Sequence, residues 1–265
     1  MFNLIIILTA FLNSEVYGSN NYKIAKYIIE NVDSLEDCSI SELASRCYVS
    51  NSSVSRFCRD IGLRDFSDLK NQVSKYQVLR DTASQKFDYK RGKDNDDKSY
   101  IDYIINNLNL LKNSLDYRAV NELVRDIYHY EHVAAFGYMQ SENIALNLQY
   151  DLQTKRKFVY TCLKYADQID YIKNADETHL IIIFSDSATY FKRAFLRNHP
   201  FKNMSKKPKI YVLTSDYNSN LPYVDRYIRY KSFNDYASHP YALLTISGLI
   251  CTGYCELVEQ GDKPE

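Results

Sequence analysis

The sequence lacks an excess of charge of either sign, and this absence limits what its 265 residues can do. Lysine and arginine number 33, and aspartate and glutamate also number 33, so the formal net charge is zero. A protein that coats nucleic acid by bulk electrostatic attraction is therefore disfavoured. Apolar content of 45% and charged content of 25% are ordinary for a soluble globular protein, and the length allows two domains.

Metal-binding motifs are also missing. The six cysteines, at positions 38, 47, 58, 162, 251 and 255, form no C-x-x-C pair, and no histidine stands at zinc-finger spacing. Cys251 and Cys255 lie one helical turn apart, as do His129 and His132, but apolar or metal-poor surroundings favour structural roles for both pairs. We expect free thiols in a reducing cytoplasm, no metal, no cofactor and no catalytic residue.

The apolar N-terminus, MFNLIIILTAFLNSEVYG, has few features of a targeting segment. It lacks a basic region at its start, is too short to span a bilayer, and is not followed by a clear A-x-A-like cleavage site. The sequence therefore predicts a buried first helix of an N-terminal domain, and no membrane partner.

Residues 39–70 predict two short helices joined by a tight turn. Ser39 and Glu42 form a Ser-x-x-Glu capping box for the first helix, and Ser50 is the natural N-cap of the second. Gly62 stands where a left-handed C-cap is expected. The second helix places Val54, Phe57, Cys58 and Ile61 on its apolar face.

The outward face of this second helix has the chemistry of a DNA-recognition helix. Short hydroxyl and amide side chains approach phosphates and base edges without steric cost, and arginine supplies forked donors. The predicted DNA-binding residues are Ser50, Asn51, Ser52, Ser53, Ser55, Arg56 and Arg59. Between Arg46 and Arg64, four arginines face one carboxylate, Asp60, a local charge of +3 that favours phosphate contact. The alternative is an ordinary αα-hairpin with solvated serines.

The string YKIAKYIIENVDSLEDCSISELASRCYVSNSSVSRFCRDIGLRDFSDLK resembles the N-terminal helix-turn-helix of the RpiR family of bacterial sugar-responsive transcription regulators. The matching elements include Ile40-x-Glu42-Leu43-Ala44, Val49-Ser50 and Val54-x-Arg56-Phe57-Cys58-Arg59, leading to Gly62. The resemblance implies a sequence-specific regulator that binds double-stranded operator DNA as a homodimer or homotetramer, with a sugar isomerase (SIS) domain following.

Composition and periodicity divide the chain into a helix-turn-helix domain (residues 1–80), a polar linker (81–99) and a second domain (100–265). Beyond the linker, helices are predicted at 100–115, 118–130, 141–155, 188–198 and 241–258, and strands at 132–136, 158–162, 178–184 and 209–214. The predicted fold is thus an all-α N-terminal domain followed by a three-layer α/β domain with a parallel sheet covered on both faces.

Two hydroxyl-rich loops follow predicted strands, where ligands bind in such folds. Ser141, Ser185, Ser187 and Thr189 are the predicted ligand-binding residues, because hydroxyls at helix N-termini hold phosphate well. They could also be N-caps only. The loops resemble the G-x-G-x-S and S-x-S-G-x-T phosphosugar motifs of SIS domains, but Met139 and Ala188 replace glycines and Tyr190 replaces the closing threonine. A Cβ there can block the anion or change the backbone path.

The leading hypothesis is a DNA-binding transcription regulator of carbohydrate metabolism genes, modulated by a phosphosugar. One alternative is a ligand-independent DNA-binding protein whose SIS-like domain only oligomerises. Another is a phosphosugar isomerase, for which Glu142, Glu256 and His239 are available bases, although the sequence does not place them together.

Overall fold

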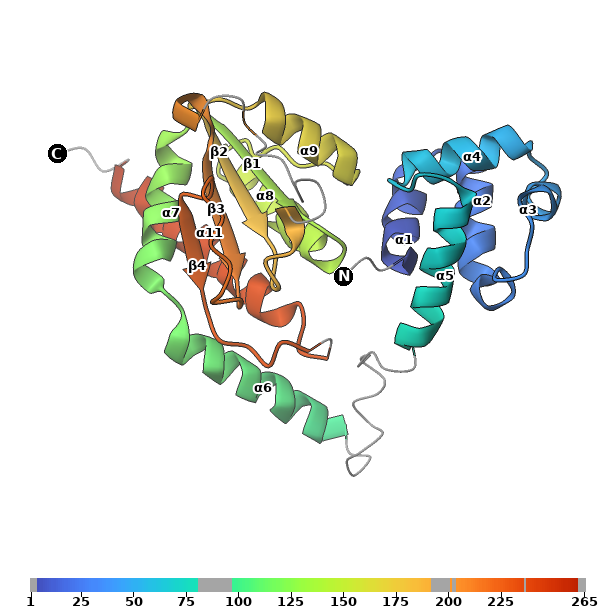
Figure 1. Ribbon diagram of the computed structural model, residues 1–265. Helices are drawn as coiled ribbons and strands as arrows, with labels where there is room; N and C mark the ends of the chain where they lie inside the picture. The colour runs from blue at the N-terminus through green and yellow to red at the C-terminus, as the bar shows by residue number, and fades with distance from the viewer. Residues whose placement is uncertain (1–3, 81–96, 192–200, 202–203, 236, 262–265) are drawn as a thin grey trace. The chain divides into compact units, whose positions relative to one another are not determined.

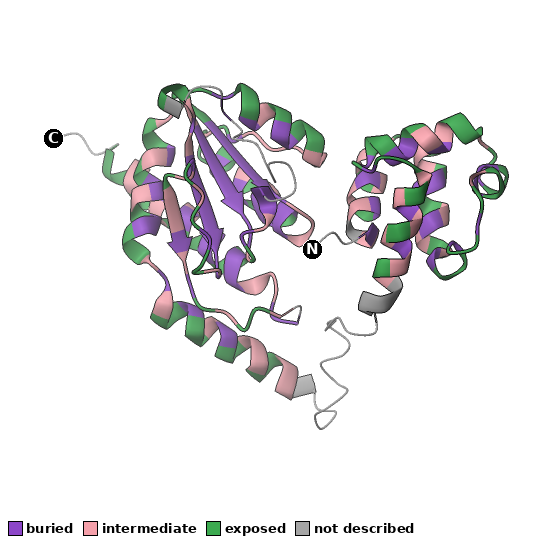
Figure 2. Ribbon diagram, viewed as in Figure 1, coloured by how far each residue is buried: buried purple, intermediate pink, exposed green. Residues whose placement is uncertain are grey.

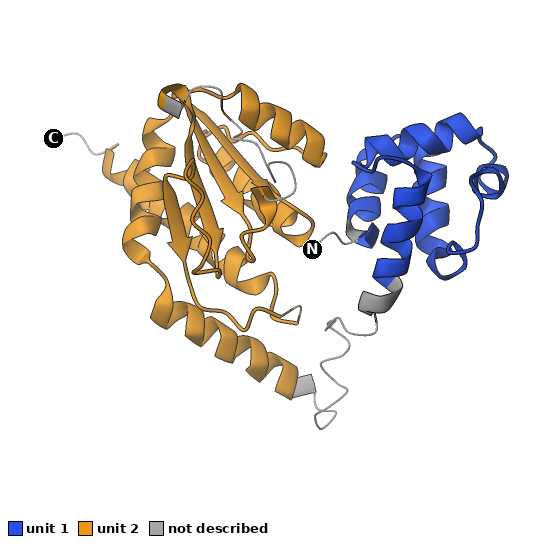
Figure 3. Cartoon of the chain, viewed as in Figure 1, with its two compact units in different colours: residues 1–83 blue, residues 84–265 orange. Residues whose placement is uncertain are grey.

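The computed structural model describes residues 4–80, 97–191, 201, 204–235 and 237–261. The chain divides into two compact units, Met1–Ala83 and Ser84–Glu265 (Figure 3). Separate hydrophobic cores lie in the two units. Residues 81–96, most of the predicted linker, lie outside the described residues.

The first unit, as far as it is described, is helical (Figure 1). Its elements are α1 (Leu4–Ser14), α2 (Asn20–Glu30), the 3-10 helix η1 (Val32–Ser34), α3 (Ile40–Arg46), α4 (Asn51–Asp60) and α5 (Phe66–Arg80). Leu4, Leu8 and Phe11 of α1 are buried in the same core as Phe57 of α4. The prediction that the apolar N-terminus forms a buried helix is thereby confirmed.

Short-range signals define the ends of α3 and α4. The backbone N–H of Glu42 donates to Ser39 Oγ at 3.1 Å, and that of Ser53 donates to Ser50 Oγ at 3.1 Å. Gly62 ends α4 with φ of +85°, a conformation that costs glycine little. Both predicted N-caps and the predicted C-cap are therefore confirmed.

The second unit contains a four-stranded parallel sheet in the order β1-β2-β3-β4. The strands are β1 (His132–Gly137), β2 (His179–Phe184), β3 (Lys209–Thr214) and β4 (Arg226–Arg229). All but the first residue of each of the first three strands is buried (Figure 2). This burial explains their continuous apolar runs, because a parallel sheet is covered on both faces.

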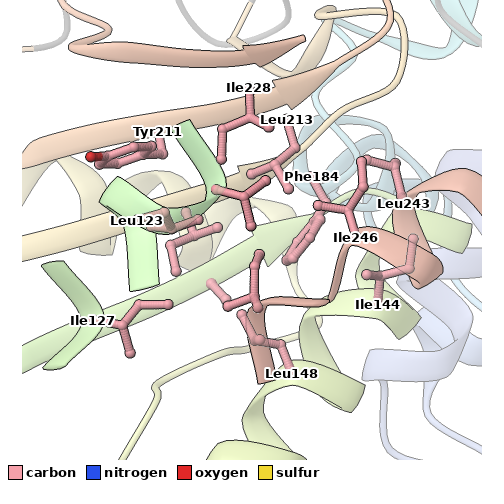
Figure 4. Close-up of a cluster of buried hydrophobic side chains, with 14 of the residues drawn as sticks. Leu123, Ile127, Ile144, Leu148, Phe184, Tyr211, Leu213, Ile228, Leu243 and Ile246 are labelled. Carbon is pink, nitrogen blue, oxygen red and sulfur yellow. The ribbon is translucent and has the colours of Figure 1, made fainter. Parts of the chain in front are cut away.

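Helices cover the two faces of the sheet with separate cores. On one face lie α6 (Asp97–Ser114), α7 (Tyr117–His129), α8 (Gln140–Thr154) and α11 (Tyr241–Gly261). Figure 4 shows Leu123, Leu148 and Ile246 from three of these helices around the strand residues. On the other face, α9 (Tyr165–Asn174) packs through Ile169 and Ile172. The predicted fold class, a helical domain followed by a three-layer α/β domain, is confirmed.

Several predicted elements differ from the structure. The strand predicted at 158–162 is only a bridge between Tyr160 and Ala134, and Phe158 is exposed. The helix predicted at 188–198 begins at Tyr190, and residues 192–198 lie outside the described part of the chain. Neither α9 nor β4 was predicted. In α9, the polar Gln168 stands at a fully buried position, so the helical spacing of apolar residues is hard to recognise. Strand β4 has only four residues, which is too short for a clear pattern.

Helix α11 is long and apolar enough, by length and composition, to cross a membrane. In the structure it packs on α7 and α8, with Leu243, Ile246 and Ile250 buried in the core. Its apolar character is therefore accounted for in part by the packing of a core helix. Leu244 and Leu249 of the same helix remain exposed.

Candidate nucleic-acid interface and strand-end loops

Helix α4 presents the predicted recognition residues away from the core. Ser50, Asn51, Ser52, Arg56 and Arg59 are exposed, whereas Ser53 and Ser55 are half-buried. The opposite face, with Val54, Phe57 and Cys58, is fully buried. The seven predicted residues therefore extend from the N-cap to the last turn of one helix, outside its buried face.

Hydrogen bonds order the N-terminus of α4. Ser50 Oγ lies 2.8 Å from Ser52 Oγ and 2.9 Å from Ser53 Oγ, and Asn51 Nδ2 donates to Ser41 Oγ at 3.0 Å. The Ser50 hydroxyl makes all three of its possible hydrogen bonds within this cluster, whereas Ser52 and Ser53 bond only to Ser50 among the described residues and keep further capacity. The cluster is thus held in place while still able to contact a ligand.

The positive charge of this region is less evenly spread than the sequence suggests. Arg46 forms an ion pair with Glu42 and donates to the Tyr27 hydroxyl at 2.7 Å, and Arg64 lies 3.6 Å from Asp68. Neither Arg56 nor Arg59 forms an ion pair within the described residues. Among these four arginines, the two that form no ion pair within the described residues are therefore both on α4.

A cavity of about 230 Å³ lies beside this helix, lined by Ser19, Asn20, Asn21, Ser53 and Arg56. Ser19 caps α2, accepting from the backbone N–H of Tyr22 at 3.0 Å. The N-terminus of α2 and the middle of α4 thus form one polar surface. The contribution of α2 was not predicted from the sequence, although a serine before a helical pattern is a recognisable N-cap signal.

The loop between β1 and α8 keeps a glycine-like backbone path without glycine at Met139. Met139 has φ of 60° and ψ of −119°, the first central position of a type II′ turn, which glycine normally occupies. Gly137 approaches the next turn so closely that a Cβ would lie 2.4 Å from the backbone carbonyl carbon of Ser141. Ser141 is buried at the start of α8.

The loop after β2 has a similar feature. Ala188 adopts φ of 50°, and its N–H donates to the Ser185 carbonyl at 2.9 Å. The carbonyl of Asp186 accepts from Thr214 Oγ1 at 2.7 Å, which ties this loop to the end of β3. A Cβ at Met139 and Ala188 was expected to block the anion or to change the backbone path. Both residues have a positive φ, a backbone conformation that favours glycine.

The hydroxyls of the second loop have different surroundings. Ser185 is buried and accepts from the N–H of Tyr190 at 3.3 Å, whereas Ser187 is exposed and its Oγ lies 2.9 Å from Thr189 Oγ1. The Tyr190 hydroxyl donates to Gln168 Oε1 at 2.7 Å within the core. Tyr190 therefore does not replace the threonine hydroxyl at the loop surface.

Glu142 is a buried carboxyl group in the first turn of α8. Burial raises the pKa of Glu142 to about 7, because the charged form loses its hydration. The two other isomerase candidates lie far from each other. His239 precedes α11, and Glu256 is exposed near its other end, about 22 Å away at 1.5 Å per residue.

Comparison with known proteins identifies the first unit. Residues 13–78 match the helix-turn-helix domain of the rpiR family. These residues are an rpiR-family helix-turn-helix domain. An uncharacterized HTH-type transcriptional regulator of Caldanaerobacter subterraneus is 43% identical over 61 residues, which cover 23% of this chain and 22% of that protein. The resemblance seen in the sequence is confirmed.

Two further matches extend beyond the rpiR-family domain. An uncharacterized HTH-type transcriptional regulator of Providencia stuartii is 26% identical over 166 residues, covering 60% of this chain and 57% of that protein. The Vibrio vulnificus NanR protein complexed with ManNAc-6P has a TM-score of 0.52 and 17% identity, covering 97% of this chain and 93% of NanR. This chain therefore shares the overall fold of NanR. The sequence matches span about a fifth to three fifths of these curated relatives.

Proposed function

We propose that the protein is a sequence-specific DNA-binding transcription regulator of carbohydrate metabolism genes, and not an enzyme. The observation that carries the proposal is the exposed polar face of α4, with unpaired Arg56 and Arg59, on an rpiR-family domain. Such a helix reads base edges in the major groove, while arginines and N-terminal N–H groups hold phosphates.

Selection from a genomic fragment library tests this function. Purified full-length protein should enrich a small set of fragments sharing one motif at physiological salt. A pool that stays unenriched after repeated rounds would contradict sequence-specific binding. The enriched fragments also supply the operator for every measurement below.

The proposed effector is a phosphosugar held by the two strand-end loops of the second unit. Ser185, Ser187 and Thr189 lie in the loop after β2, and Ser141 lies in the first turn of α8, which follows β1. Ligands bind at these carboxyl ends of parallel strands in α/β folds. The left-handed backbone at Met139 and Ala188 supports the proposal, because it preserves the path of a glycine-containing phosphate loop. NanR, which shares the fold, forms a complex with the phosphosugar ManNAc-6P.

Substituting Ser187→Ala is expected to weaken phosphosugar binding by about 1.5–3 kcal/mol, the value of a hydrogen bond to a charged group. Ser187 is suited to the test because, among the described residues, its exposed hydroxyl bonds only to Thr189 of the same loop. Calorimetry with a panel of hexose and amino-sugar phosphates measures the change, with Ser45→Ala in the first unit as control. Undiminished affinity would place the pocket elsewhere. Absence of any binding at millimolar ligand would instead favour the ligand-independent alternative.

Assembly through the second unit is the remaining part of the proposal. Ile101 and Ile105 of α6 are 59% and 49% exposed, and Leu244 and Leu249 of α11 are 42% and 38% exposed. Exposed apolar side chains on two helices that contact each other are typical of a subunit interface. A two-fold dimer would also place two recognition helices on a palindromic operator.

The full-length chain is therefore expected to be a homodimer or homotetramer at micromolar concentration. Leu249→Glu should shift it to monomer, because the new carboxylate would be desolvated in the interface. Phe158→Glu is the matched control, since Phe158 is 64% exposed but lies outside α6 and α11. Light scattering measures both. A wild-type monomer, or an unchanged mass for Leu249→Glu, contradicts this arrangement.

A further inference from the structure

Three helices of this protein end in the same hydrogen-bonded motif. In each, the residue after the C-cap donates to the carbonyl three residues before it, and the next residue donates to the carbonyl five before it. In α3, Tyr48 N donates to Ser45 O (3.1 Å) and Val49 N to Ala44 O (2.9 Å). In α4, Gly62 N donates to Arg59 O (2.9 Å) and Leu63 N to Cys58 O (2.8 Å). In α8, Arg156 N donates to Gln153 O (2.9 Å) and Lys157 N to Leu152 O (3.0 Å). This Schellman motif needs a left-handed residue, usually glycine.

Tyr48 occupies this glycine position in the turn of the helix-turn-helix. Its φ is 56°, compared with 85° for Gly62 at the corresponding position of α4. A left-handed backbone brings the Cβ of any L-residue close to its own carbonyl, so tyrosine is less stable here than glycine. A glycine-compatible position has thus been filled by a large residue at a cost in stability.

Packing within the unit does little to offset this cost. The side chain of Tyr48 is 91% exposed, and its hydroxyl has no hydrogen-bond partner within the described residues. By contrast, Tyr27 in the same unit packs against the core and bonds to Arg46. A strained residue with an exposed aromatic side chain indicates a role outside the folded chain itself.

The position of Tyr48 indicates what that role is. It lies two residues before Ser50, the N-cap of α4, and therefore next to the end of the recognition helix that enters the groove. A side chain leaving the chain at this point reaches the sugar-phosphate backbone that borders the groove. Tyrosine hydroxyls are among the groups that bind DNA phosphates and fix the register of a protein on the duplex.

We infer that the Tyr48 hydroxyl donates a hydrogen bond to a backbone phosphate of the operator and positions α4 in the groove. The inference rests on the proposed DNA-binding function and adds a contact to it. Because tyrosine is uncharged, this contact displaces no counterion. It contributes affinity without contributing to the salt dependence of binding, unlike Arg56 and Arg59.

The test is Tyr48→Gly in the full-length protein, with a DNA fragment selected by the wild type. The expected result combines two opposite changes. The thermal transition of the first unit should rise by about 2–5 °C because strain is relieved, and DNA affinity should fall about five- to tenfold. The slope of log affinity against log salt should stay at the wild-type value. Tyr48→Phe should lose affinity to a similar extent.

Arg156→Gly is the matched control, because it relieves the same left-handed strain in the same motif of the second unit. It should raise the stability of that unit and leave DNA affinity within about twofold. Tyr48→Gly with wild-type affinity overturns the inference, as does a lowered transition temperature or a Tyr48→Phe variant that binds like wild type. If the wild type selects no DNA, the proposed function itself fails. If Arg56→Ala loses affinity while Tyr48→Gly does not, only this inference fails.

Discussion

Replacing Arg56 and Arg59 together with alanine should weaken operator binding by about 2–6 kcal/mol, because each arginine contact contributes about 1–3 kcal/mol. Both side chains are exposed and lie off the apolar face of α4, so the fold should be unaffected. The slope of log affinity against log salt should also fall by about one for each phosphate that the variant no longer binds. Fluorescence anisotropy over a salt series measures both quantities.

Arg46→Ala is the matched control for this experiment. Its guanidinium is already bound to Glu42 and Tyr27, so its removal should affect operator binding much less than the double substitution. Circular dichroism and the thermal transition check that both variants are folded. A folded Arg56→Ala, Arg59→Ala variant that binds its operator like wild type would refute the assignment of α4 as the recognition helix.

Glu142→Gln is expected to change how stability depends on pH. The pKa of Glu142 is raised by burial to about 7 from the ordinary 4.5, so the folded protein binds more protons than the unfolded chain between these values. Stability should therefore fall as pH rises from about 4.5 to 7 and stay lower above it. At 1.36 kcal/mol per pKa unit, the total contribution is about 3 kcal/mol. Glutamine is neutral at every pH, so Glu142→Gln removes this pH-dependent contribution to stability.

Urea unfolding of the second unit at pH 5 and pH 8 measures this difference. Wild type should lose up to about 3 kcal/mol between the two conditions relative to Glu142→Gln. Glu256→Gln is the control, because it makes the same substitution at an exposed position of α11. Equal pH dependence in wild type and Glu142→Gln would show that this carboxyl group is not desolvated in solution.

The sequence alone determined the helix-turn-helix and its polar face. Ser39 and Ser50 bond to backbone groups three residues away, and Gly62 takes a conformation suited to its lack of a Cβ. These signals operate within one or two turns, so they can be identified without knowing the rest of the chain. Strands β2 and β3 could also be predicted from their continuous apolar runs, because a parallel strand covered on both faces is apolar along its whole length.

Only the tertiary structure decided the features that depend on distant contacts. Gln168 is buried in α9 because Tyr190, 22 residues away, donates to it, and no local pattern indicates this partner. Arg46 also donates to the hydroxyl of Tyr27, 19 residues earlier on α2, and no local pattern indicates this contact. The backbone of Ala188 is held by a loop that β3 anchors from more than 20 residues away. Local sequence fixes where helices begin and end, whereas packing determines which polar groups remain available for binding and which residues are held in strained conformations.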